Sequence, residues 1–164
     1  MDIWELEGPW AGKLALCSRP RSGWFLEDDL RALPAAGYRN LVSALTPDEV
    51  VAAELQRVPE MAPAAGLAFH HFPVGNLQVA VPERARPCLD AWHELLASGE
   101  GIAVHCWATV GRGPSLAAAL LVRGGVDIGV AWQRITAARG REVPDTLEQQ
   151  RWPAHFVPGV FPPA

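Results

Sequence analysis

The chain has 164 residues, a formal net charge of -4 and 49% hydrophobic residues, a size and composition that fit one compact domain over residues 1–164. No apolar run reaches the roughly 18 residues of a membrane span, the charge gives no general attraction for nucleic acid, and three scattered cysteines match neither a disulfide framework nor a zinc site. Because the start also lacks the basic segment and apolar core of a secretory signal, we expect a cytoplasmic domain without membrane or nucleic-acid partners, metal or cofactor.

Strands and helices are expected to alternate along the chain. The segment "IWELEGPWAGKLALCSRP" predicts two strands around a Gly-Pro turn, the second over residues 13–17. Further strands are expected in "RNLVSAL", "LAFHHFPV" and "GIAVHC". Helices are expected in "FLEDDLRALPAAG", in "TPDEVVAAELQRV" with Thr46 at the N-cap and Pro47 just inside it, and in "PERARPCLDAWHELLASG", "PSLAAALLVRGG", "DIGVAWQRITAARG" and "DTLEQQRWPAHF".

This alternation predicts an α/β fold, in which a mostly parallel central sheet carries helices on both faces in three layers. Ligands of such sheets bind outside the carboxyl ends of the strands. Cys106 directly follows the strand expected over residues 102–105, so it lies at that edge. A lone cysteine at the end of a buried strand is most often an inert small hydrophobe. A functional role for Cys106 therefore depends on the residues that surround it in the sequence.

The residues after Cys106 form a short loop that leads into a helix. The loop consists of Trp107, Ala108, Thr109, Val110 and Gly111, and Arg112 closes it. Backbone N–H groups of such a loop can point into one concavity at the positive end of the helix dipole, which suits a phosphate or sulfate ion. The planar guanidinium of Arg112 can pair with two phosphate oxygens. The same positive field favours an ionised thiol on Cys106, the form that acts as a nucleophile.

The run from His105 and Cys106 to Arg112 resembles the HCx5R signature of the cysteine-dependent protein tyrosine phosphatases, specifically the small dual-specificity type. The segments "SRPRSGWFLEDDLRAL", "NLVSALTPDEV", "FHHFPVGNLQVAVPE" and "ARGREVPDTLEQQRW" are similar to a bacterial branch of that superfamily. The resemblance implies a dual-specificity-phosphatase-like fold and hydrolysis of phosphate monoesters, phosphotyrosine or another phosphoester in a protein or small molecule.

The resemblance also implies roles for particular residues. Cys106 would attack phosphorus and form a cysteinyl-phosphate intermediate, while Arg112 would hold the phosphate oxygens. His105 would orient the loop and tune the thiol. Gln149 resembles the glutamine that positions the hydrolytic water in related enzymes, and Gln150 is an equally near choice in the sequence.

Three positions depart from the pattern of that family. Counted from Phe72, the aspartate that protonates the leaving oxygen is replaced by Asn76, and an amide releases no proton near neutral pH. Loss of a general acid costs about 10²- to 10⁴-fold in rate. Gly113 stands where the family usually has Ser or Thr, and Trp24 where an acidic residue is more common. We therefore expect weakened turnover or, as the alternative, a pseudophosphatase that binds phosphate or a phosphoprotein without efficient turnover.

Other side chains could replace the missing acid. The sequence offers Glu83, Asp90, His70, His71 and Asp28, and each of them also has an ordinary structural interpretation. The backbone of the loop faces the anion, so the indole of Trp107 should point away from it, either into the core or to the pocket rim, where it could stack on an aromatic substrate. Of these two positions we expect the core.

Overall fold

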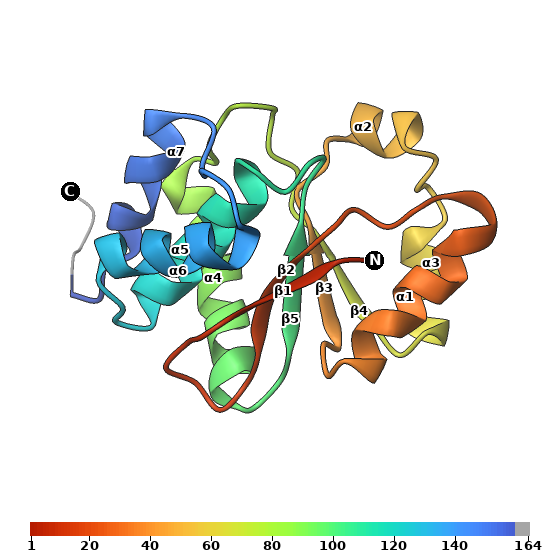
Figure 1. The fold of residues 1–164 in the computed structure, drawn as a ribbon, viewed down its shortest axis with the longest axis horizontal. Helices are drawn as coiled ribbons and strands as arrows, with labels where there is room; N and C mark the ends of the chain where they lie inside the picture. The colour runs from red at the N-terminus through yellow and green to blue at the C-terminus, as the bar shows by residue number, and fades with distance from the viewer. Residues whose placement is uncertain (160–164) are drawn as a thin grey trace.

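In the computed structural model, which describes residues 1–159, a five-stranded sheet lies between two groups of helices (Figure 1). The strands follow one another across the sheet in the order β1-β2-β5-β3-β4. Their bounds are β1 (Ile3–Leu6), β2 (Leu14–Cys17), β3 (Asn40–Ser43), β4 (Ala68–His71) and β5 (Ile102–His105). Only the β1–β2 pair is antiparallel among these described strands, which confirms the mostly parallel sheet that the alternation predicts.

Helices cover both faces of this sheet, as predicted (Figure 1). One face carries α1 (Leu26–Ala35), which follows the short 3-10 helix η1 (Gly23–Phe25), and α3 (Val58–Ala64). The other face carries α4 (Pro82–Ala97), α5 (Arg112–Arg123), α6 (Ile128–Arg139), α7 (Leu147–Arg151) and the 3-10 helix η2 (Trp152–Phe156). No helix within residues 1–159 is both long and apolar enough to cross a membrane.

The strands contribute side chains to two separate hydrophobic clusters, because successive side chains of a strand point to opposite faces of the sheet. Leu16 and Val104 pack into the cluster beneath α4 and α5, whereas Ala15 and Ala103 pack into the cluster beneath α1 and α3. Helix α5 is buried from Arg112 to Val122, in keeping with its Ala- and Leu-rich sequence. Its N-terminus is therefore held rigidly at the carboxyl edge of the sheet.

The helix predicted over residues 46–58 is too long. The helix α2 (Pro47–Ala52) has the predicted cap, in which Thr46 and Glu49 bond reciprocally, but it ends six residues early. Glu54 adopts a left-handed φ of 55°, and the Leu55 N–H donates to the carbonyl of Val50 at 2.9 Å. The turn allows Leu55 to enter the core, where it is 3% exposed. Burial of an apolar side chain therefore overrides the helical preference of this segment.

Candidate active site

Cys106 lies at the junction of β5 and the loop that leads into α5. Its sulfur faces the first turn of that helix, since a Cβ atom built on Gly113 would lie 3.7 Å from both the Sγ and the backbone nitrogen of Cys106. Cys106 is only 2% exposed. The sulfur thus lies near the positive end of the α5 dipole, at the bottom of the loop.

Thr109 fixes the shape of the loop. It has a φ of 53°, a left-handed conformation that costs a residue with a Cβ about 1 kcal/mol. The buried Thr109 hydroxyl donates to the carbonyl of Cys17 at 2.8 Å and accepts the Cys106 N–H at 3.4 Å, so the conformation is held from two sides. Gly111, by contrast, has an ordinary φ of -101°. A side chain at Gly111 would instead overlap with the Asp145 carboxylate and the Gln149 amide, which lie directly against the loop.

Arg139, at the end of α6, holds the loop from outside. Its Nε donates to the Thr109 carbonyl at 2.8 Å and its Nη2 to the Ala108 carbonyl at 3.4 Å. In a trans peptide the N–H points away from the carbonyl of the same unit, so the N–H groups of Thr109 and Val110 point to the opposite side. Arg139 therefore turns these two donors inward, a role for which the sequence carries no local signal.

Arg112 is tied to Glu49 of α2 by two short hydrogen bonds. Its Nη1 lies 2.6 Å from Oε2 of Glu49 and its Nη2 lies 2.8 Å from Oε1, and Nη1 also donates to the Val74 carbonyl at 2.8 Å. Arg112 is buried, whereas the Glu49 side chain is 21% exposed. The pKa of Glu49 is lowered, chiefly by its hydrogen bonds from Arg112. Burial opposes the charge on Arg112, but the bonds to Glu49 leave the pKa of Arg112 raised overall.

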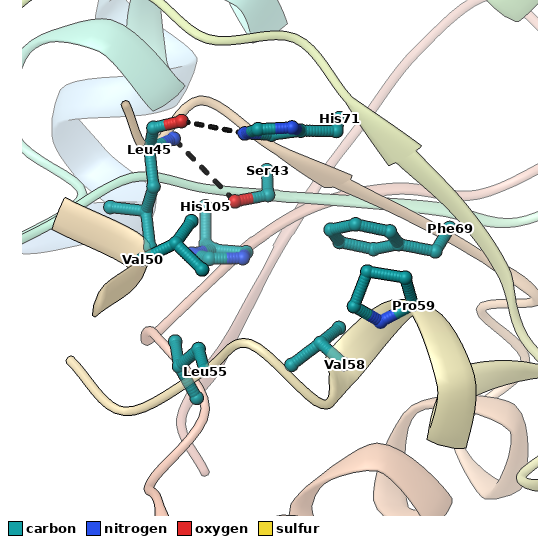
Figure 2. Close-up of a pocket in the computed structure, with 9 residues that line it drawn as sticks. All are labelled: Ser43, Leu45, Val50, Leu55, Val58, Pro59, Phe69, His71 and His105. Atoms are coloured by element: carbon teal, nitrogen blue, oxygen red, sulfur yellow. Dashed lines mark hydrogen bonds between the residues drawn. The ribbon is translucent and has the colours of Figure 1, made fainter. Parts of the chain in front are cut away.

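His105 supports the loop from behind. Its Nδ1 donates to the carbonyl of Cys106 at 3.2 Å. Burial is the main cause that lowers the pKa of His105 to about 4, and the imidazole is therefore neutral at neutral pH. The ring reaches a small cavity that is lined mostly by apolar side chains, among them Leu45, Val50 and Phe69 (Figure 2). The cavity has a volume of about 50 Å³. This apolar cavity suits no phosphate, and the bond from Nδ1 to the Cys106 carbonyl is the hydrogen bond of His105 to the loop.

Trp107 does not pack into the core, so the expectation of a core position for its indole is wrong. The side chain is 41% exposed and the Arg19 guanidinium stacks on it, 3.9 Å from the ring centroid. Trp107 and Asn76 line one open groove together with Asp48, Glu49 and Ala52. Residues 109–112 that follow in the loop are buried, whereas the indole lies at the surface beside Arg19.

The structure distinguishes Gln149 from Gln150. Gln149 is fully buried beside Gly111, accepts the Thr146 N–H at 3.2 Å and donates to the Gln78 carbonyl at 3.3 Å. Gln150 is exposed, and it contributes a carbonyl to the indole N–H of Trp132. Only Gln149 of this pair lies against the loop.

The alternatives to Asn76 that the sequence offers are engaged elsewhere or lie outside the groove. His70 bonds to Asn40, His71 bonds to the Leu45 carbonyl, and Asp90 pairs with Arg123. Glu83 and Asp28 occupy the first turns of α4 and α1, and Trp24 is 98% exposed on η1. Among residues 1–159, no three His, Cys, Asp or Glu side chains gather as a metal site requires.

A family model described as "Polymorphic toxin system, DSP-PTPase phosphatase" matches residues 17–126. No curated protein matches the chain. Solved structures resemble it at low identity. A kinase-associated phosphatase with its catalytic-site cysteine replaced by serine is 17% identical and has a TM-score of 0.85, with 95% of this chain and 93% of that chain covered.

Two further solved structures have the same fold. The protein Tk-PTP in its active form is 19% identical with a TM-score of 0.73, over 91% of this chain and 94% of its own. A protein tyrosine phosphatase from Leishmania major is 22% identical with a TM-score of 0.71, over 93% of this chain and 97% of its own. At these identities the likeness concerns the fold.

Proposed function

The chain belongs to the DSP-PTPase phosphatase family of polymorphic toxin systems, and on this premise we propose that it hydrolyses phosphate monoesters through a cysteinyl-phosphate intermediate on Cys106. One observation carries the proposal: a single loop holds the buried Cys106 sulfur near the α5 N-terminus and continues into Arg112, whose guanidinium Glu49 fixes with two hydrogen bonds. Such an arrangement preorganises positive charge before the ester binds.

The loop and the residues packed against it share the steps of the proposed reaction. The inward N–H groups, the helix dipole and Arg112 bind the phosphate oxygens, and Cys106 attacks phosphorus as a thiolate. The ester P–O bond breaks as the S–P bond forms. Gln149, held against Gly111, orients the water that then attacks phosphorus and releases the thiolate. His105 stays neutral and positions the loop through its bond to the Cys106 carbonyl.

The substrate is proposed to be a phosphorylated protein or small molecule, and inorganic phosphate or sulfate is expected to occupy the same loop. The groove beside it carries Trp107, whose indole offers an apolar face to an aromatic group on the phosphate. Asn76 lies in this groove and supplies no proton. We therefore expect aryl phosphates with acidic leaving groups to react much faster than alkyl phosphates.

A second function is favoured by two observations at the same loop. Cys106 is 2% exposed, and the position after Arg112 is Gly113, which offers no hydroxyl to the sulfur. A pseudophosphatase would retain the anion-binding loop and bind phosphate or a phosphoprotein without efficient turnover.

One kinetic experiment separates the two functions. We would measure the burst and steady-state release of p-nitrophenol from p-nitrophenyl phosphate for the wild type, Cys106→Ser and Asn76→Asp. An enzyme releases p-nitrophenol in a reaction that Cys106→Ser abolishes, and Asn76→Asp should increase its turnover of phenyl phosphate, whose leaving oxygen is more basic. A pseudophosphatase shows phosphate binding by calorimetry in the wild type, with product release no faster than in Cys106→Ser.

A further inference from the structure

The proposed reaction needs a group that donates a proton to the leaving oxygen, and the amide of Asn76 cannot do so. Within residues 1–159, three carboxylates lie at the loop or its groove. Glu49 uses both oxygens to bind Arg112, which stabilises its ionised form. Asp48 lines the open groove beside Asn76 and Trp107. Asp145 lies against the loop itself, at Gly111.

The contact between Asp145 and Gly111 is close. A Cβ atom on Gly111 would overlap with Oδ2 of Asp145, so the loop can approach the carboxylate only because it has a glycine there. The φ of Gly111 is -101°, which any residue adopts, and the backbone conformation therefore does not explain the glycine. The glycine instead leaves room for the Asp145 carboxylate to contact the loop at Gly111, the residue directly before Arg112.

The structure also fixes the backbone on which Asp145 stands. The next residue, Thr146, caps α7, because its hydroxyl accepts the Gln149 N–H at 3.1 Å while the Gln149 side chain accepts the Thr146 N–H at 3.2 Å. The buried Gln149 side chain packs on Gly111 as well. Asp145 itself is exposed, and its carboxylate forms no hydrogen bond or ion pair with any residue in the described part of the chain. The backbone of Asp145 is therefore fixed beside the loop, and its carboxylate has no partner among the described residues.

We propose that Asp145 is the proton donor and acceptor of this site and supplies the acid that Asn76 cannot provide. As the ester P–O bond breaks and the S–P bond to Cys106 forms, the Asp145 carboxyl gives its proton to the leaving oxygen. Water then attacks phosphorus, Asp145 takes a proton from that water, and the S–P bond breaks to restore the thiolate. The products are the alcohol and inorganic phosphate, and the proton that Asp145 takes from water replaces the one that it gave to the leaving oxygen.

The test compares two leaving groups, because a proton donor matters most when the leaving oxygen is basic. With the full chain, kcat for phenyl phosphate should fall about 10²- to 10³-fold in Asp145→Asn. Single-turnover release of p-nitrophenol from p-nitrophenyl phosphate should fall less than about fivefold in the same variant, because a good leaving group needs little protonation. Glu148→Gln removes a neighbouring exposed charge on α7 and is the matched control, with both rates unchanged.

Three further results bear on the inference, which rests on the proposed function. Recovery of phenyl phosphate turnover in Asp145→Glu supports it, since the carboxyl returns. An equal loss on both substrates in Asp145→Asn would indicate a structural role and overturn it, as would a selective loss on phenyl phosphate in Asp48→Asn alone. A wild type no faster than Cys106→Ser on p-nitrophenyl phosphate would instead overturn the phosphatase itself, so the two failures are distinguishable.

Discussion

Glu49→Gln tests whether the pair between Glu49 and Arg112 organises the site. The substitution keeps the size of the side chain but leaves the buried guanidinium without its counter-charge. Removing one partner of a buried pair costs about 3 to 5 kcal/mol. We expect about 3 kcal/mol, the lower end, because Glu49 is 21% exposed and Arg112 keeps its hydrogen bond to the Val74 carbonyl. For a domain of this size that corresponds to a melting temperature lower by about 6 to 12 °C.

The same pair predicts how stability depends on pH. The folded-state pKa of Glu49 lies below its ordinary value of 4.5, so the unfolded chain binds more protons in that range. The contribution of the pair is full above about pH 4.5 and is lost as the pH falls through the folded-state pKa. The difference in melting temperature between the wild type and Glu49→Gln should therefore shrink below about pH 4.5.

Thermal unfolding and steady-state kinetics at several pH values measure these effects. Turnover of p-nitrophenyl phosphate should fall about 10²-fold, since Arg112 loses its fixed orientation. Glu27→Gln is the control, because Glu27 and its partner Arg31 are exposed, and its melting temperature should change by about 1 °C at most. A Glu49→Gln variant that melts like Glu27→Gln at every pH would refute the reasoning.

Three other substitutions probe the loop. Gly113→Ser places a hydroxyl beside the Cys106 sulfur, since a Cβ at position 113 lies 3.7 Å from the sulfur. The hydroxyl should speed release of the thiolate from the intermediate about tenfold, and Gly113→Ala should not. Equal rates for the two variants in rapid-quench assays would count against this. Gly111→Ala should lower kcat about 10²-fold because its methyl group displaces Asp145, and wild-type kinetics would contradict the contact. Arg139→Gln releases two loop carbonyls and should weaken competitive inhibition by phosphate about tenfold, an effect absent if the N–H groups are oriented without it.

Much of the fold follows from local patterns. Buried apolar runs such as the one over β5 predict strands, and their alternation with helices predicts the parallel sheet. The end of α2 could not be predicted this way, because residues 53–55 favour a helix and only the tertiary burial of Leu55 breaks it. Helix α3 is likewise not predicted by the local pattern: Pro59 stands in its first turn, where proline is tolerated, but Pro63 lies inside the helix, where proline is unfavourable.

Part of the candidate site could likewise be predicted from the sequence and part could not. Cys106 and Arg112 are six positions apart and belong to one loop, so their spacing in the sequence carries the signal. Glu49 and Arg139 reach that loop from 63 and 30 residues away, and nothing in their own segments marks them. Thr46 explains Glu49 as a capping partner, which hides its second role at Arg112. The exposure of Trp107 depends on its contact with Arg19 across the fold, which no local pattern specifies.

The central claim is that Cys106 carries the phosphoryl group during turnover. Rapid acid quench of the wild type with p-nitrophenyl phosphate, followed by peptide mass spectrometry, tests it most directly. We expect one phosphoryl group on the peptide that contains Cys106, and none in Cys106→Ser. Turnover with no phosphoryl group on Cys106, or with the group on another residue, would contradict it.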